Sequence, residues 1–240
     1  MSDAPSIRNT ESGFSLIELI IAMVITIAIT AMAGNLLVES LKMRTRANAT
    51  TDALADAQRA LNIMSREIAG AGFNLSDNGI VPEDSVTDAN GNSTIRIRSN
   101  LNKFNPTGAT STPAQNSIGV TGEDAGEDVK YFIHPASNTN LLARYDAYNA
   151  PGGTSTVLAN RLDSLHIHYF SQKVTYTTNG CDISNASLSE VSPGSAAYIV
   201  IAVCVVQPAV GTPGSPGYQP PTRVLLASDV ALRNSNLPIY

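Results

Sequence analysis

An uncharged apolar stretch of twenty residues, 19–38, constrains this chain more than any other feature. In an α-helix, at about 1.5 Å per residue, such a stretch spans roughly the 30 Å hydrocarbon layer of a membrane. The next most apolar run covers only eleven residues, 196–206, and its β-branched composition is typical of a buried strand. The sequence therefore predicts at most one membrane-spanning helix, close to the N-terminus.

Two ordinary explanations of an N-terminal apolar stretch fit poorly. A secretory signal peptide has a basic leader, a shorter apolar region and small residues after it. Here Arg8 is outnumbered by two acidic leader residues, and the small residues Ser12 and Gly13 precede the apolar stretch. A plain membrane anchor would avoid Glu18, because a carboxylate inside an apolar span is costly and normally has a partner or a function.

The residues around Glu18 form a specific motif. It reads Gly13-Phe14-Ser15-Leu16-Ile17-Glu18, followed by the apolar stretch. This motif resembles the class III signal of type IV pilins and of the related type II secretion pseudopilins. The resemblance implies that a prepilin peptidase cuts between Gly13 and Phe14 and methylates the new N-terminus at Phe14. It also implies that Glu18 pairs with the terminal amine of a neighbouring subunit and sets the register of assembly.

The same resemblance predicts where the protein resides. It implies a single-pass inner-membrane protein with a periplasmic head, which later enters a pilus at the cell surface. The basic residues just beyond the apolar stretch, Lys42, Arg44 and Arg46, would by themselves favour the opposite topology. The processing motif outweighs this bias in our interpretation, because it is a constellation of several residues.

A second helical segment is expected at residues 41–69, which contain no Pro or Gly. Apolar residues recur there at spacings of three and four, which predicts a helix with one narrow apolar stripe: Leu54, Ala57, Leu61, Met64 and Ile68. Gly70 and Gly72 should end this helix. A coiled-coil seam is the alternative, but only two heptads are present. The charged residues should form the solvated face: Arg44, Arg46, Asp52, Asp56, Arg59, Arg66 and Glu67.

The remaining chain shows short alternating runs separated by turn residues, which predicts strands at 94–98, 129–133, 141–145, 165–170, 173–177, 196–206 and 224–227. The run 196–206 has no polar face, so it should be a central strand covered on both sides, with the stalk helix on one of them. We therefore expect an α+β fold, a long N-terminal transmembrane and stalk helix packed on a mainly antiparallel β-sheet head, as in the type IV pilin lollipop. The expected divisions are a leader at 1–13, a membrane or filament-core helix at 14–40, a stalk helix at 41–72 and a head at 73–240.

Later blocks of the sequence refine the resemblance. They look like PilW-type minor pilins and lie at 60–73, 142–144, 160–170 and 229–234. The J-type minor pseudopilin of type II secretion shares this layout and stays open as an alternative, whereas Glu18 argues against the K-type tip subunit. The expected function is that of a minor pilin in pilus assembly and initiation near the filament tip. The expected partners are other major and minor pilins, the prepilin peptidase and the inner membrane. A membrane-anchored binding domain on a plain helix is the second alternative.

Other chemistry is weakly indicated. A net charge of −5 disfavours direct nucleic-acid binding through a basic surface. We expect no enzymatic activity and no cofactor, since the chain lacks a nucleophile elbow, a metalloprotease His-Glu-x-x-His and a phosphate loop. Cys181 and Cys204 could form one disulfide in an oxidising compartment, closing a loop of about 24 residues with a stabilisation of roughly 3 kcal/mol. The alternative is a buried Cys204 with a free thiol at Cys181.

Three groups of residues could in principle hold a metal. His166 and His168 project from one strand face and could share an ion with His134 if its strand is adjacent, but a solvated face is the favoured interpretation. Residues 88–92 place oxygen ligands at alternate positions, yet an Asn-Gly turn fits better than a calcium loop. Residues 122–128 hold four carboxylates and are expected to form a solvated loop, with calcium as the alternative. We therefore predict no metal site.

Overall fold

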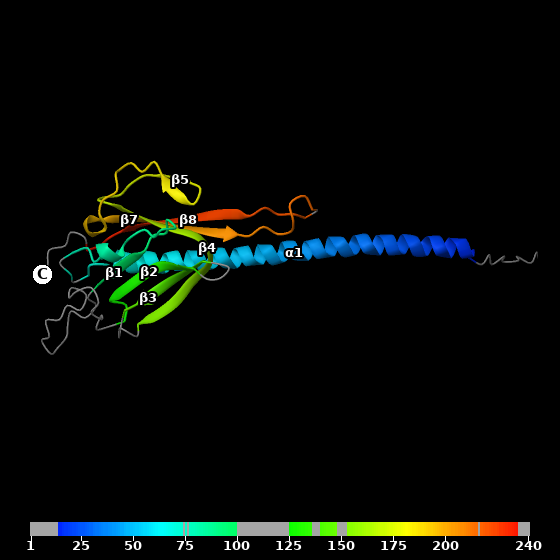
Figure 1. Cartoon of the computed structure of the whole chain (residues 1–240), viewed down its shortest axis with the longest axis horizontal. Coiled ribbons are helices and arrows are strands. Elements are labelled where there is room, and N and C mark those ends of the chain that lie inside the picture. Colours follow the sequence, from blue (N-terminus) through cyan, green and yellow to red (C-terminus); the bar gives the residue numbers. More distant parts are fainter. Residues whose placement is uncertain are drawn as a thin grey trace, which may run out of the picture. The chain divides into compact units, whose positions relative to one another are not determined.

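The structure is a computed structural model that describes residues 14–73, 75, 77–99, 125–135, 140–147, 153–215 and 217–234. Gly13 and the rest of the expected leader lie outside these residues. The chain divides into two compact units, Met1–Ala47 and Asn48–Tyr240. One helix, α1 (Leu16–Ala69), contributes to both units (Figure 1).

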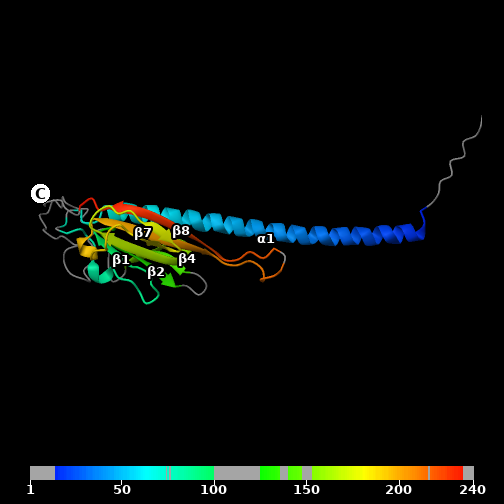
Figure 2. The same ribbon diagram turned by 90° about the horizontal axis from the view of Figure 1, so that it is seen from above.

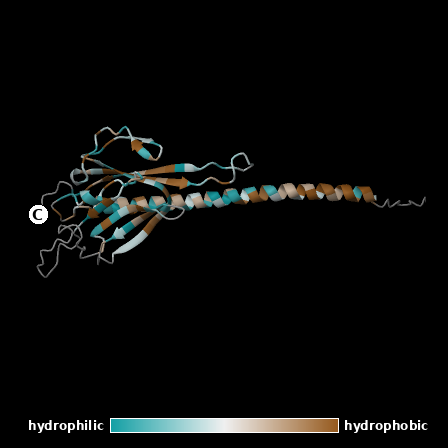
Figure 3. Ribbon diagram, viewed as in Figure 1, coloured by the Kyte–Doolittle hydropathy of each residue, from teal (hydrophilic) through white to brown (hydrophobic). Residues whose placement is uncertain are grey.

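None of the described residues covers an apolar side of the first part of α1, residues 16–47. Its large apolar side chains are exposed in every direction, and Figure 3 shows the hydrophobic colour over the N-terminal portion of the helix. The hydroxyls of Thr26 and Thr30 donate back to the carbonyl oxygens of Ala22 and Thr26, at 2.7 and 2.8 Å. These bonds satisfy the two hydroxyls without water, as an apolar environment requires. By length and composition the helix can cross a membrane.

The second part of α1, residues 48–69, buries one stripe. Four of the five predicted stripe residues are fully buried, whereas Leu54 is only partly buried. Ala53 and Ala60 complete the buried face, and their small side chains let the sheet approach the helix closely. The helix ends at Ala69, and Gly72 follows with a φ of 74°. A side chain at Gly79 would collide with the backbone of Gly72, and one at Gly72 would collide with the backbone of Asp77 and Asn78.

Six strands form one sheet in the order β1-β2-β3-β4-β7-β8, and every neighbouring pair is antiparallel. Two short strands, β5 and β6, form a separate hairpin. Two 3-10 turns, η1 (Pro82–Asp84) and η2 (Pro193–Ser195), lie in the connections. The strands are β1 (Ile95–Arg98), β2 (Asp128–Pro135), β3 (Asn140–Asp146), β4 (Thr154–Phe170), β5 (Thr177–Asn179), β6 (Asp182–Ser184), β7 (Tyr198–Gln207) and β8 (Thr222–Ala231). The expected α+β class, a helix on a mainly antiparallel sheet, is confirmed.

Strand β4 joins two halves of the sheet. Its first half pairs with β3 and its second half, from Leu162 onward, pairs with β7. Arg161 lies at the junction with a φ of 58°, which is rare for a residue other than glycine, and its guanidinium donates to the Ala49 carbonyl of α1 at 3.1 Å. Figures 1 and 2 show the C-terminal part of α1 against one face of this sheet, with β2 and β3 to one side of it and β7 and β8 to the other.

Strand β7 is covered on both faces, as its apolar run predicted. Ile199, Ile201 and Val203 belong to the core that contains the buried stripe of α1. Tyr198 and Val200 point to the opposite face and belong to a second cluster, with Phe170 and Val174. The strand is interior to the sheet, although only β8 lies beyond it.

Two strand predictions were wrong. Of the predicted strand 173–177, only Thr177 is in a strand. Strand β6 was not predicted, because a strand of three residues is too short to show an alternating pattern. Strand β4 begins at Thr154, well before the predicted 165. Its first residues are polar and exposed, so they carry no sign of a buried face.

Glu67 does not lie on a solvated helix face as predicted. Its carboxylate accepts hydrogen bonds from the Tyr131 hydroxyl and from the Arg144 guanidinium, the latter at 3.0 Å. Burial raises the pKa of Tyr131, and the neighbouring Glu67 charge raises it further. Glu67 is next to the stripe residue Ile68, and strands β2 and β3 extend past the stripe to reach it. The carboxylate therefore ties α1 to the sheet.

Candidate functional site

Two residues lie between the predicted cleavage point and the first residue of α1. Phe14 and Ser15 precede the helix, and the Ser15 carbonyl accepts the backbone N–H groups of Glu18 and Leu19 at 3.0 and 3.2 Å. Phe14 is 82% exposed. The Gly13–Phe14 bond therefore lies outside the described helix, and cleaving it breaks none of these hydrogen bonds.

Glu18 lies in the first turn of α1. The free N–H groups there carry partial positive charge, which stabilises a carboxylate. The spacing Ser15-x-x-Glu18 matches a capping box, which is a local sequence signal for a helix that begins after Ser15. Glu18 is also the only ionisable residue between Leu16 and Val38, and no cation among the described residues contacts it. In an apolar environment its charge would need a partner from outside the described chain.

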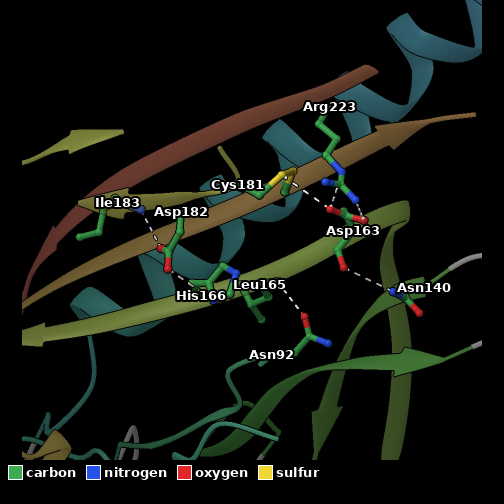
Figure 4. Close-up of a disulfide and its surroundings, with 10 residues drawn as sticks. Asn92, Asn140, Asp163, Leu165, His166, Cys181, Asp182, Ile183 and Arg223 are labelled. Atoms are coloured by element: carbon green, nitrogen blue, oxygen red, sulfur yellow. Dashed lines mark hydrogen bonds and ion pairs between the residues drawn. A yellow bond between two sulfur atoms is a disulfide. The ribbon is translucent and has the colours of Figure 1, made fainter. Parts of the chain in front are cut away.

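Cys181 and Cys204 form a disulfide whose Cα atoms are 5.3 Å apart (Figure 4). The bond joins the β5–β6 turn to the middle of β7. An Asp163 carboxylate oxygen lies 3.7 Å from the Cys181 sulfur and forms an ion pair with Arg223 at 2.8 Å. The two sulfurs and Asp163 lie close enough to hold a metal. Bonded to each other, however, the sulfurs are not the thiolates that a metal requires.

The two neighbouring histidines do not occupy a solvated face, so that interpretation was wrong. The His168 ring contacts Glu190 through Nδ1 at 2.8 Å and Asp182 through Nε2 at 2.7 Å. His166 Nδ1 lies 3.7 Å from the other oxygen of Asp182. His134 is not part of this group, because β3 lies between its strand β2 and strand β4.

The two acidic loops differ from each other. In residues 88–92 the Asp88 carboxylate accepts the backbone N–H groups of Asn90 and Asn92, both at 2.8 Å, and Gly91 has a φ of 85°. This geometry is the predicted turn. In residues 122–128 the first three lie outside the described residues, and Glu127 and Asp128 are buried instead of solvated. Asp128 accepts hydrogen bonds from Arg96 at 2.7 Å and from Arg98, the residue opposite it on β1, at 3.2 Å.

Comparison with known proteins adds one finding. Residues 8–34 match the family model of the prokaryotic N-terminal methylation motif, and they include the Gly13–Phe14 junction, Glu18 and most of the apolar stretch 19–38. A search of curated proteins and a search of solved structures found no match. The motif supports a type IV pilin-like or pseudopilin role, and together with the apolar helix it fits an anchor in the inner membrane. It does not extend to the head.

Proposed function

We propose that the chain is a minor pilin of the PilW type that acts in assembly and initiation near the tip of a type IV pilus. The observation that carries the proposal is the start of α1. There a methylation motif, an exposed Phe14 ahead of the helix and a single carboxylate are followed by an apolar helix with no covered face. Such a helix needs an apolar environment, which is the bilayer before assembly and the filament core after it.

Glu18 gives this helix an assembly function. After cleavage at Gly13, Phe14 carries a new terminal amine, and the amine of a neighbouring subunit is the cation that a buried Glu18 carboxylate lacks. Such a pair forms only when two helices are correctly staggered, so it would set their register. The other proposed partners are the prepilin peptidase, the major and minor pilins and the inner membrane. The head would lie in the periplasm and then on the cell surface, without enzymatic activity and without direct contact with nucleic acid.

The J-type minor pseudopilin of a type II secretion system is the competing proposal. The same motif serves both systems, and the matched residues 8–34 do not include the head that would distinguish them. Deleting the gene separates the two. A minor pilin deletion should reduce surface pili while synthesis of the major pilin stays normal, whereas a pseudopilin deletion should abolish secretion through the type II system. Normal piliation in the deletion strain would contradict the assembly role.

The Glu18→Ala variant tests the assembly mechanism. It should still be cleaved at Gly13, and it should enter the membrane at least as well, because removing an intramembrane charge relieves about 2.5 kcal/mol or more. Its incorporation should fail, because an unpaired amine in an apolar core costs on the order of 3–5 kcal/mol. The measurement is the amount of variant in sheared pilus fractions at equal membrane abundance.

Glu39→Ala is the matched control, because Glu39 is the carboxylate just beyond the other end of the apolar stretch. It should be incorporated like the unmodified chain. If Glu18→Ala is incorporated equally well, Glu18 does not set the register and the helix is a plain anchor. Mass spectrometry of the mature N-terminus tests the processing step separately, and an uncleaved chain would favour the membrane-anchored binding domain.

A further inference from the structure

Residues 171–197, between β4 and β7, form a cover over one face of the sheet, and we call this segment the flap. It contains the β5–β6 hairpin and η2. Beneath it lies the second apolar cluster, in which Val200 of β7 is completely buried and Tyr198 is 7% exposed. Tyr176, Ile183, Ala186 and Leu188 pack on this cluster from the flap and are only partly buried. The flap therefore shields an apolar face of β7 with a thin layer.

Two neighbouring residues, Cys181 and Asp182, hold the flap to the sheet, one by a disulfide and the other by an ion pair. Cys181 is tied covalently to Cys204 of β7. The next residue, Asp182, is tied to His168 of β4 by the contact at 2.7 Å. A third contact, at 2.8 Å, joins the opposite nitrogen of the same ring to Glu190, farther along the flap. His168 thus holds the flap at two points that are eight residues apart in the sequence.

The geometry specifies the protonation state of this ring in the closed flap. A neutral imidazole has one N–H donor, and its other nitrogen carries a lone pair. Both His168 nitrogens face carboxylate oxygens at hydrogen-bond distance, so a neutral ring would place one lone pair against an anion. Only the doubly protonated imidazolium donates to both carboxylates.

The other groups around His168 do not change this conclusion. His166 lies on the same strand face and approaches the Asp182 oxygen that His168 does not use. Strand β7 places Val200 opposite His168, and β8 places Asp229 opposite Val200, where it accepts the Tyr176 hydroxyl at 2.6 Å. Burial opposes the charge on His168 and its hydrogen bonds with Glu190 and Asp182 favour it, with the result that its pKa is raised.

We propose that the flap is a proton-sensitive cover, closed by the His168 imidazolium between Asp182 and Glu190 and tethered independently by the Cys181–Cys204 disulfide. The closed flap binds the second proton of His168 more tightly than the open flap does. The free energy by which protonation favours the closed flap is therefore fully present below the ordinary pKa of histidine. It is lost as pH rises through the raised pKa of the closed state. Between the two pKa values, the opening equilibrium constant should rise by up to about tenfold per pH unit.

The two fastenings make distinct predictions along the flap. In the oxidised chain the disulfide still holds β6 when His168 loses its proton, so alkaline loosening should be confined to the segment around Glu190. In the reduced chain no covalent tie remains, and loosening should extend through the β5–β6 hairpin. Strands β7 and β8 should respond in neither state.

Hydrogen exchange of the full-length chain in detergent tests the proposal, with rates corrected for the intrinsic effect of pH. The informative amides are Val191 N–H, bonded to the Tyr169 carbonyl at 2.9 Å, and Ser187 N–H, bonded to the Thr175 carbonyl at 2.9 Å. Their protection should fall as pH rises from 6 to 9. Protection that stays constant over this range overturns the proposal.

Three variants sharpen the test. His168→Gln cannot take a second proton, so flap protection should be lower and independent of pH. His166→Gln, the matched control on the same strand face, should keep the pH dependence. Glu190→Gln, at a side chain that is 53% exposed, cannot disturb the core and should move the transition to lower pH. If Glu190→Gln leaves the transition unmoved, or His166→Gln abolishes it, the flap is not controlled by His168.

Discussion

The two parts of α1 belong to one continuous helix but follow opposite rules of burial. Residues 16–47 expose large apolar side chains in all directions, and Glu18 is their only charge before Glu39. Residues 48–69 carry five charged side chains off the stripe and bury one stripe of six residues. An α-helix forms its backbone hydrogen bonds within itself, in water as in a membrane, so one continuous helix can contain both parts. The difference shows that the second part is stabilised within its own chain, whereas the first needs an apolar environment from elsewhere.

The largest expected effect contrasts a leucine in each part. Leu61→Ala removes a side chain that is 1% exposed and should cost the head about 2–5 kcal/mol of unfolding free energy. Leu37→Ala, in the exposed part, should leave head unfolding unchanged. Urea unfolding of both variants in detergent, followed by tyrosine fluorescence, measures the contrast. Equal losses would mean that the two parts do not follow different rules.

The disulfide should have the next largest effect, and only on the second unit. Cys181→Ala with Cys204→Ala should lower the unfolding free energy by roughly 3 kcal/mol on the chain-entropy estimate. Thiol labelling of denatured, unreduced protein gives an independent reading. Two reactive thiols would show that the bridge does not form in the cell, and the stability loss should then be absent.

A smaller loss of unfolding free energy is expected when Glu67 is replaced, because this residue adds a polar contact with the sheet to the apolar stripe of α1. Glu67→Gln removes the closer of the two carboxylates that pair with Arg144, leaving Asp146 at 3.3 Å, and should cost about 1–3 kcal/mol. Arg66→Gln is the control one residue away, at an exposed side chain with no polar partner among the described residues, and should cost less than about 0.5 kcal/mol. An equal loss of unfolding free energy in the two variants would show that Glu67 behaves as a solvent-exposed residue.

The smallest effect is expected for a hydroxyl in the apolar part. Thr26→Val replaces a hydroxyl with a methyl group, and this hydroxyl donates only to the Ala22 carbonyl of its own helix, at 2.7 Å. Membrane insertion should change by less than about 1 kcal/mol, in the favourable direction, because valine is more apolar. A glycosylation-based insertion assay measures this change. A clear loss of insertion would show that the hydroxyl has a partner outside the chain.

Local patterns were sufficient where a feature depends on near neighbours in the sequence. The length and apolarity of residues 19–38, the 3-4 spacing of Ala57, Leu61, Met64 and Ile68, and the apolar run of β7 are all periodic signals within one element. The motif from Gly13 to Glu18 is local as well, and the family model matched it without information about the head. These features were predicted because one segment contains the whole physical cause.

Only the tertiary structure decided which distant side chains meet. Glu67 bonds to Arg144, 77 residues away, and His168 meets Asp182 and Glu190 because a three-residue strand folds back over β4. In the sequence these residues show only polarity, which predicts solvent exposure. Their burial depends on how β2 and β3 pack against α1 and on the path of the flap over β4, which no local pattern relates. The sequence by itself thus determined the helix and its apolar environment, and tertiary packing determined the ion pairs that fasten the head.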